Sequence, residues 1–283
     1  RTWLRDGGHI PEALDGFSEF FLEANSPHRV VSDLPDDVTE AFDDDSPIAF
    51  FPDCETRRYQ PQLVKRIGHV LERVLGEKVR LITRIGDEGK ACCGFPLASA
   101  GDAEGFEAYA GDLSYDLLGA EEVITDCAAF VAMTRGETFS ERVPIPVTYI
   151  FETLDERLTD RMVRQKIDVP ETVFLHDSCF TARHVKNGVQ ITRRVLAKIA
   201  DNPLREFSTN GDDTICCGGA SHYRVVAEES ADQCARERLT QLEREGGDAI
   251  VCAGQTCAKH MNRAGGDVTP LLEWVCDAVL EPS

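Results

Sequence analysis

The sequence predicts an α/β protein built as two similar lobes in tandem, each a small parallel sheet flanked by helices. Three observations support this fold class. Short apolar runs alternate with longer amphipathic segments, as in repeated βαβ units. A C…CCG…C series of cysteines occurs twice, around Cys92-Cys93-Gly94 and around Cys216-Cys217-Gly218, about 125 residues apart. The length of 283 residues allows two domains of ordinary size.

The expected first lobe begins with the apolar strand 48–51, which runs into Pro52-Asp53-Cys54. A helix over 62–75 carries its apolar residues on one face and ends at Gly76. The later elements are a strand at 79–82, a helix over 103–118, a strand at 122–125 that leads into Cys127, a helix starting at 128–133, a strand or connector at 147–150, and a charged helix over 155–166.

The expected second lobe repeats this order. It contains a strand at 173–176 before Cys179, a helix over 189–199, a weak strand at 205–207, a long helix over 225–245, a strand at 249–251 before Cys252, and a closing helix over 271–280. Crossover connections of this kind give parallel strands, and ligands of such sheets lie at the carboxyl ends of the strands. We therefore expect the cysteine loops to meet at that edge of each sheet.

Three segments are expected along the chain: a connector at 1–45, a first cysteine-rich domain at 46–168 and a second at 169–283. The connector carries large apolar side chains that a free tail would not leave in water, namely Trp3, Leu4, Phe17, Phe20 and Phe21. We expect them to pack on another domain or subunit, or back onto the second lobe.

Composition narrows the class of protein and its compartment. A net charge of −20 argues against nucleic acid and against anionic membrane surfaces. No apolar run approaches the ~20 residues of a membrane helix, and no signal peptide is recognisable, so we expect a cytoplasmic chain that does not span a membrane. Eleven cysteines in such a chain indicate reduced thiols that bind metal rather than a disulfide framework.

The cysteine spacing favours iron–sulfur clusters over zinc. Thiolates select zinc, copper(I) or iron–sulfur clusters, and zinc sites usually draw on two close pairs of ligands. Here the ligands come from separated loops, and two adjacent thiolates reach different irons of a cluster more readily than one zinc ion. The expected metal ligands are Cys54, Cys92, Cys93, Cys127, Cys179, Cys216, Cys217, Cys252 and Cys257. Gly94, Gly218 and Gly219 should let the loops turn and bring backbone amides to cluster sulfur.

Four segments and the doubled series resemble the cysteine-rich CCG-domain family over about residues 46–283. The segments are Phe51-Pro52-Asp53-Cys54, Ala91-Cys92-Cys93-Gly94-Phe95-Pro96, His176-Asp177-Ser178-Cys179 and Ile215-Cys216-Cys217-Gly218-Gly219. The family includes the B subunit of heterodisulfide reductase, the iron–sulfur subunits of glycolate oxidase and anaerobic glycerol-3-phosphate dehydrogenase, and the lactate-utilisation iron–sulfur protein. The resemblance implies one or two [4Fe-4S] clusters, non-cubane in some members, and oxidoreductase work on thiols, disulfides, quinones or flavin partners.

The chain departs from the B subunit of heterodisulfide reductase, in which each lobe ends in C-x₂-C. Phe130 stands where the second thiol of the first lobe would be, and Gly254 stands where the first thiol of the second lobe would be. Each lobe keeps four matching cysteines, enough for a cubane, while Cys252 is a spare thiol in the second lobe. The sequence allows either a cubane or a non-cubane cluster. Many relatives carry a two-cluster ferredoxin domain before this region, and we expect any such domain upstream of Arg1 or in another subunit.

The residues and the resemblance together predict an iron–sulfur subunit of a cytoplasmic oxidoreductase complex of heterodisulfide-reductase-like type. The expected partner is a ferredoxin-like or flavin-containing redox subunit, within a hetero-oligomer. We expect substrate chemistry in the second lobe, where His176 tunes the cluster or shuttles a proton and Arg183 approaches an anionic substrate. Cys234 and Cys276 are interpreted as ordinary thiols.

Two other functions fit the same residues. One is an electron-transfer scaffold whose fully ligated clusters have no pocket beside them and whose catalysis lies in another chain. The other is a zinc-stabilised, redox-silent interaction module, which would be colourless where an iron–sulfur protein is brown.

Overall fold

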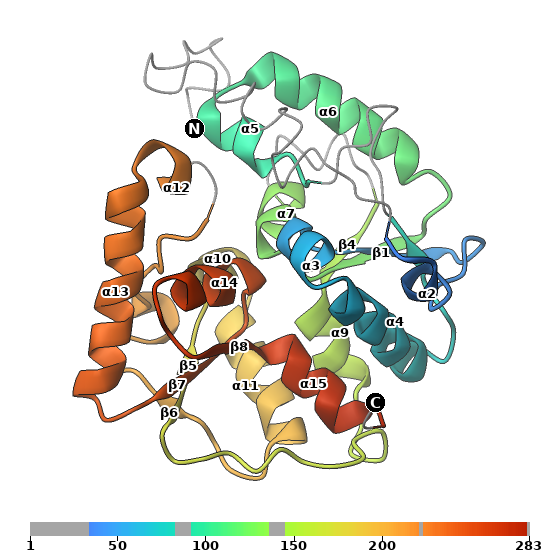
Figure 1. The fold of residues 1–283 in the computed structure, drawn as a ribbon. Coiled ribbons are helices and arrows are strands. Elements are labelled where there is room, and N and C mark those ends of the chain that lie inside the picture. Colours follow the sequence, from blue (N-terminus) through green and yellow to red (C-terminus); the bar gives the residue numbers. More distant parts are fainter. Residues whose placement is uncertain (1–33, 83–91, 136–144, 221–222, 282–283) are drawn as a thin grey trace.

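The computed structural model describes residues 34–82, 92–135, 145–220 and 223–281. They form two four-stranded parallel sheets with helices around them, which confirms the predicted fold class (Figure 1). The first sheet has the order β2-β1-β3-β4 and the second has the same order, β6-β5-β7-β8. The strands of the first are β1 (Ile48–Phe51), β2 (Arg80–Leu81), β3 (Glu122–Thr125) and β4 (Val147–Tyr149). Those of the second are β5 (Val173–His176), β6 (Arg205–Glu206), β7 (Ala249–Cys252) and β8 (Val268–Pro270).

The helices of the first lobe follow the predicted order. They are α2 (Asp36–Thr39), α3 (Cys54–Tyr59), α4 (Pro61–Leu75), α5 (Phe95–Ala100), α6 (Ala103–Asp116), α7 (Ala128–Thr134) and α9 (Ile150–Arg157). Helix α4 shows why these bounds arise: Pro61 occupies its first turn, and Gly76 ends it at a φ of 87°, a conformation that glycine adopts without strain. Its apolar residues Leu63, Ile67, Val70, Leu71 and Val74 are buried in the hydrophobic core.

The helices of the second lobe surround β5 and β7. They are α10 (Cys179–His184), α11 (Gly188–Ile199), the 3₁₀ helix η2 (Gly211–Asp213), α12 (Tyr223–Val226), α13 (Glu228–Arg244), α14 (Gln255–Arg263) and α15 (Leu271–Val279). Long α13 lies at one edge of the molecule, whereas α10 and α14 point towards its centre (Figure 1). No helix in the described part of the chain is both long and apolar enough to cross a membrane.

The two lobes pack together because the last helix of each lobe lies on a helix of the other lobe. Helix α9 of the first lobe lies on α11 of the second, and α15 of the second lies on α4 of the first. Arg194 of α11 donates to Asp155 of α9 at 2.6 Å, and Arg66 of α4 donates to Asp277 of α15 at 2.5 Å. One hydrophobic cluster of buried residues runs through both lobes. The lobes therefore share a core.

Two predicted helices have other bounds in the structure, and helices α3, α5, α10 and α14 were missing from the prediction. The charged helix expected over 155–166 ends at Arg157, because the backbone N–H groups of Arg164 and Gln165 donate to Ala278 of α15 instead of continuing a helix. The long helix expected over 225–245 is broken at Ala227 into α12 and α13. Strand β8 was missing from the prediction; it pairs with β7 from Ile250 to Cys252.

The end of the expected connector belongs to the first lobe. Val38, Ala41 and Phe42 are buried in the common core, and the Phe42 ring stacks parallel to Phe50 with 6.3 Å between centroids. The apolar residues Trp3, Leu4, Phe17, Phe20 and Phe21 lie outside the described residues. The boundaries of the two cysteine-rich domains, at 46–168 and 169–283, remain predictions.

Candidate metal centre

The strand ends bring the expected cysteines together, since parallel strands deliver their following loops to one edge. Cys54 begins α3 shortly after β1, and Cys179 begins α10 in the corresponding place after β5. Cys127 is the N-cap of α7, shortly after β3, and Cys252 is the last residue of β7. Cys257 lies in the first turn of α14.

The first set consists of Cys54, Cys92, Cys93 and Cys127. Its sulfurs form a continuous series of contacts in which Cys93 and Cys127 lie 3.9 Å apart and Cys54 contacts Cys92. Contact with the Cys92 thiol lowers the pKa of Cys54, but burial and nearby carboxyl groups raise it to about 12. The pKa of Cys127 is raised by contact with Cys93 and by burial. Such thiols need the charge of a bound metal to ionise, as soft thiolate ligands of metals do.

The second set is larger. Cys179 and Cys216 lie 3.6 Å apart between sulfurs, Cys217 contacts both Cys216 and Cys257, and Cys252 contacts Cys257. Contact with the thiol of Cys179 lowers the pKa of Cys216, which is the more exposed of these two residues. All eleven cysteines lie in the described part of the chain and none of them forms a disulfide. The donor sets therefore fit thiolate-bound metal.

Glycines shape the two loops that carry the adjacent cysteines. Gly94 and Gly218 have φ values of 79° and 80°, the region that favours glycine. A Cβ on Gly218 would lie 2.4 Å from the carbonyl oxygen of Ala231, so the loop also passes too close to α13 for a side chain. The amides of Gly218 and Gly219 donate to the sulfurs of Cys216 and Cys217, each at 3.4 Å.

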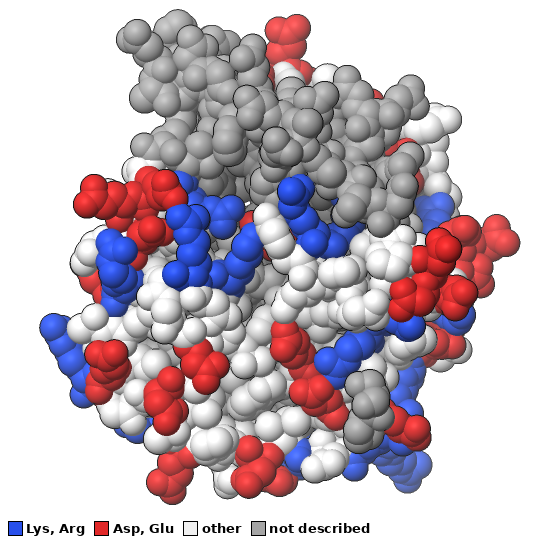
Figure 2. Space-filling view, viewed as in Figure 1, with Lys and Arg blue, Asp and Glu red and all other residues white. Residues whose placement is uncertain are grey.

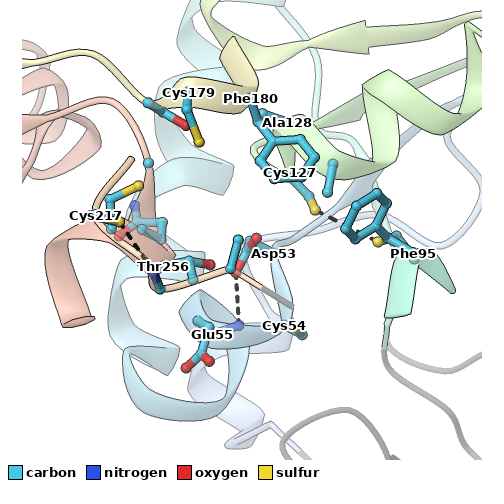
Figure 3. A pocket seen from close by; sticks show the side chains of 18 of the residues that line it. Asp53, Cys54, Glu55, Phe95, Cys127, Ala128, Cys179, Phe180, Cys217 and Thr256 are labelled. Carbon is cyan, nitrogen blue, oxygen red and sulfur yellow. Dashed lines mark hydrogen bonds between the residues drawn. The ribbon is translucent and has the colours of Figure 1, made fainter. Parts of the chain in front are cut away.

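A cavity of about 390 Å³ lies between the two sets of cysteines. Its lining includes all four cysteines of the first set and Cys179, Cys216, Cys217 and Cys257 of the second. Figure 3 shows Cys179 and Cys217 on one side of it and Cys127 on the other. Phe95 and Phe180 meet in its wall edge to face, with 5.0 Å between ring centroids. Both sets of thiols thus face a common space.

Charged side chains from both lobes lie in or beside the lining of the cavity. Glu55 of α3 is buried and accepts from Arg224 of α12 at 3.3 Å and from Lys259 of α14. Arg263 of α14 pairs with Glu228 of α13. In the view of Figure 2, basic side chains gather in a band across the middle of the molecule, among more widely spread acidic ones.

Buried polar groups differ between the two sets. In the first lobe Asp126 accepts from the backbone N–H of Asp53 at 2.5 Å, and burial raises the pKa of both carboxyl groups. In the second lobe the Nε of Arg238 donates to Nδ1 of His176 at 3.0 Å. Burial and the Arg238 charge lower the pKa of His176 to about 3, so the imidazole is neutral at pH 7.

Arg183 does not lie where the sequence predicted it, whereas Cys234 and Cys276 lie away from the cavity, in keeping with their interpretation as ordinary thiols. Arg183 is not among the described residues that line the cavity; its guanidinium donates to the carbonyl oxygens of Asp212 and Thr214 and so holds the η2 turn. We therefore leave it out of the proposed site. Cys276 is buried in α15 and Cys234 lies in α13, and neither lines the cavity. Whether the nine expected cysteines ligate metal stays a prediction.

Sequence reasoning missed Arg238, Asp126 and Glu55. Arg238 had a recognisable signal: it follows Ala231 and Ala235 and precedes Leu242 on one face of α13, and all four are buried. A charged residue on the apolar face of an amphipathic helix indicates a buried partner. Asp126 precedes Cys127 directly, but nothing in the sequence shows that it bonds to Asp53.

A two-lobed parallel α/β fold with paired thiol sets at its strand ends defines a cysteine-rich domain protein with two similar halves. The chain belongs to the cysteine-rich domain family CCG, whose model matches residues 48–129 and 173–262. The two matched segments contain the first three strands of each sheet and the cysteine loops, which confirms the predicted resemblance.

Comparison with individual proteins adds one curated relative. The chain is 25% identical over 217 residues to the B subunit of the fumarate reductase (CoM/CoB) of Methanothermobacter marburgensis, and covers 42% of that protein against 76% of itself. Among solved structures, a candidate Asp/Glu racemase from Yersinia pestis gives a TM-score of 0.36 at 12% identity, covering 82% of this chain and 96% of that one. An aspartate racemase homologue from Pyrococcus horikoshii gives 0.28 at 13% identity, covering 81% and 95%. These structural likenesses are too distant to assign a function.

Proposed function

We propose that the chain is the iron–sulfur subunit of an oxidoreductase complex, with one [4Fe-4S] cluster in each lobe and a substrate space between them. The observation that carries this proposal is the cavity lined by four thiols of each lobe. Iron–sulfur clusters supply one-electron transfer over a wide range of potentials. The cysteines of each set would hold the metal, while the Gly218 and Gly219 amides would hydrogen-bond the sulfur ligands.

The favoured substrate class is a disulfide or its thiols. Cleavage of a disulfide bond takes up two electrons and two protons and releases two thiols, and two facing sites offer two electrons at the same cavity. The electrons would come from a ferredoxin-like or flavin-containing partner subunit in the cytoplasm, and the protons from water that reaches the cavity. The relative named as a fumarate reductase subunit supports a redox role for the complex.

The cavity beside both sites argues against the alternative of an electron-transfer scaffold, which would have no pocket beside its clusters. The alternative of a zinc-stabilised module rests on the same thiols, because His176, Cys217 and Cys257 place one ligand atom each within 4.8 Å of one another. Such a mixed nitrogen and sulfur set is typical of zinc. Metal analysis distinguishes the two.

The test is anaerobic purification followed by iron, sulfide and zinc analysis, with electron paramagnetic resonance (EPR) of the oxidised and reduced protein. We expect a brown protein with iron and acid-labile sulfide and with signals from two centres. Turnover is then measured with a disulfide, a quinone and a flavoprotein as acceptors. Zinc without sulfide would refute the proposal, and reduction of a quinone but not of a disulfide would reassign the substrate class.

A further inference from the structure

The two lobes differ at one matched position beside their cysteines. Strands β1 and β5 take the same place in their sheets, and each ends three residues before the first cysteine of its lobe. The last residue is Phe51 in β1 and His176 in β5. Phe51 is paired with Thr125 of β3, whereas His176 is paired with Cys252 of β7. The first lobe therefore has an apolar ring where the second has an imidazole.

The hydrogen bond from Arg238 fixes which nitrogen of His176 carries the proton. A guanidinium N–H only donates, so Nδ1, which accepts it at 3.0 Å, has no proton. The neutral ring then carries its proton on Nε2. That nitrogen is fully buried without a hydrogen-bond partner among the described residues, and one of the two ring nitrogens of His176 lies within 4.8 Å of the sulfurs of Cys217 and Cys257. An N–H donor is thus placed beside the second set of thiols.

Arg238 adds a buried positive charge close to Cys217 and Cys252 of the second set. It is 0% exposed, and its guanidinium lies over the Phe207 ring, 3.7 Å from the centroid. Its other N–H groups donate to neutral acceptors, namely Thr209, Thr214 and Gln241. Arg238 forms no salt bridge in the described part of the chain, and the carboxyl groups of Asp177 and Glu245 act on it only from beyond salt-bridge distance. A buried cation is costly without a nearby negative charge, and thiolates at the second site would provide one.

The same argument weighs against His176 as a metal ligand. A ligating imidazole binds metal through an unprotonated nitrogen and donates its other N–H to an acceptor. Here Arg238 approaches the second nitrogen as a donor, the opposite of that arrangement. In the first lobe the groups near the cysteines include the Phe51 and Phe130 rings, 4.9 Å apart between centroids, the carboxyl groups of Asp53 and Asp126, and the buried Tyr109, whose pKa is raised by burial and by Cys92 and Cys93.

We propose that His176, oriented by Arg238, donates an Nε2–H hydrogen bond to the sulfur ligands of the second site, and that this pair makes the second site the more easily reduced of the two. The inference rests on the proposed iron–sulfur function. Hydrogen bonds to cluster sulfur and nearby positive charge both stabilise the reduced form. His176 is a tuning residue here, and the corresponding position in the first lobe lacks any such donor.

The test is an EPR-monitored redox titration of the iron-replete protein. His176→Phe places the first-lobe residue in the second lobe, and Phe51→Leu is the matched control. At a fixed potential we expect His176→Phe to lower the ratio of reduced to oxidised second centre about tenfold, equal to about 59 mV for one electron. The first centre should be unchanged, and Phe51→Leu should change neither. The second centre is identified by its altered signal in Cys217→Ser.

Arg238→Lys separates the effect of the positive charge from the orientation of His176. It keeps the charge but removes the planar guanidinium group that holds the imidazole. We expect its second-centre ratio to fall between those of the wild type and His176→Phe. Unchanged ratios in both variants, with iron and sulfide intact, would overturn the inference and leave the proposed function standing. Wild-type protein without iron or sulfide would overturn the proposed function as well.

A measurement on the wild type covers the case in which these variants do not fold. Pulsed EPR on protein labelled with ¹⁵N-histidine, in H₂O and D₂O, reports nitrogen and exchangeable protons near each centre. Backbone amides supply exchangeable protons at both centres, so we expect the difference in the labelled nitrogen: a weak histidine coupling at the second centre only. A strong nitrogen coupling would show His176 bound to iron and would overturn the donor role, as would the lack of a histidine coupling at the second centre.

Discussion

At the scale of single residues, the candidate site depends on thiols that are buried side by side and on the backbone that turns around them. Gly94 and Gly218 make room for the adjacent pairs, and amides after Cys216 and Cys217 reach their sulfurs. The spacing of the cysteines and glycines in the sequence had predicted this arrangement of thiols and backbone amides. The hydrogen bond between Arg238 and His176 could not be foreseen, because the two residues lie 62 positions apart.

Replacing one cysteine of each adjacent pair tests the two sites separately. Cys93→Ser should remove iron from the first lobe and Cys217→Ser from the second, because each loses a buried thiolate ligand. We expect Cys217→Ser to lower turnover at least about 10- to 100-fold, as measured with the natural donor alongside iron content. Cys234→Ser in α13 is the control, with no change expected. Lost turnover in Cys93→Ser, together with full iron and rate in Cys217→Ser, would contradict our assignment of substrate chemistry to the second lobe.

Gly218→Ala tests the close approach of the second loop to α13. The positive φ costs about 1–2 kcal/mol for a residue with a side chain, and the clash with the Ala231 carbonyl adds about 1–3 kcal/mol. Gly119→Ala is the control, since Gly119 has a φ of 82° but nothing within 4 Å of a Cβ. Urea unfolding of both variants should show the larger loss for Gly218→Ala. Equal losses would mean that the loop moves away from α13 at little cost.

At the scale of elements, the helix patterns were predictable and the strands less so. Helix α4 and strand β1 follow from apolar periodicity, whereas the two-residue strands β2 and β6 are recognised only from their neighbours. The segment after Arg157 has the composition of a helix. Its backbone bonds to the other lobe instead, and a local pattern cannot report a contact with Ala278.

Because α9 packs on the second lobe and α15 on the first, we expect the two lobes to unfold together. Leu154 of α9 and Leu272 of α15 are buried in the common core, so each Leu→Ala change should cost about 2–5 kcal/mol. Far-UV circular dichroism and the fluorescence of Trp274 should report one coincident urea transition in each variant. Leu118→Ala, at a site 64% exposed, should stay within about 0.5 kcal/mol of wild type. Two separate transitions would show that the lobes are independent.

At the scale of the whole molecule, the two lobes enclose the cavity, and hydrogen bonds and ion pairs between them hold the lobes together. Tyr149 of β4 contacts Thr181 at 3.2 Å and donates to the carbonyl oxygen of Ala253 at 3.3 Å, across the lobes. Glu55 also joins the lobes, through Arg224 and Lys259. The position of one set of thiols relative to the other depends on these contacts.

Glu55→Gln should loosen this connection. The Glu55 side chain is 5% exposed, but Arg224 and Lys259 are 20% and 34% exposed, so water screens part of the interaction. We expect a loss of about 1–2 kcal/mol, below the ~3–5 kcal/mol of fully buried pairs, and a stronger loss at low salt. Glu228→Gln breaks a pair that is more than half exposed and should cost less than about 1 kcal/mol. Urea unfolding at two salt concentrations measures both, and equal effects would rule out a special role for Glu55.

The sequence by itself determined the two-lobed α/β fold, the order of its main elements and the family, because periodicity and cysteine spacing are local and repeat in the chain. It also placed Cys54, Cys127 and Cys179 at strand ends, since parallel strands send their loops to one edge. Only the tertiary structure decided that the two sets of thiols face one cavity, that Arg238 reaches His176, and that Glu55 joins the lobes. Those features arise where segments distant in sequence pack together, and no local pattern of residues encodes such contacts.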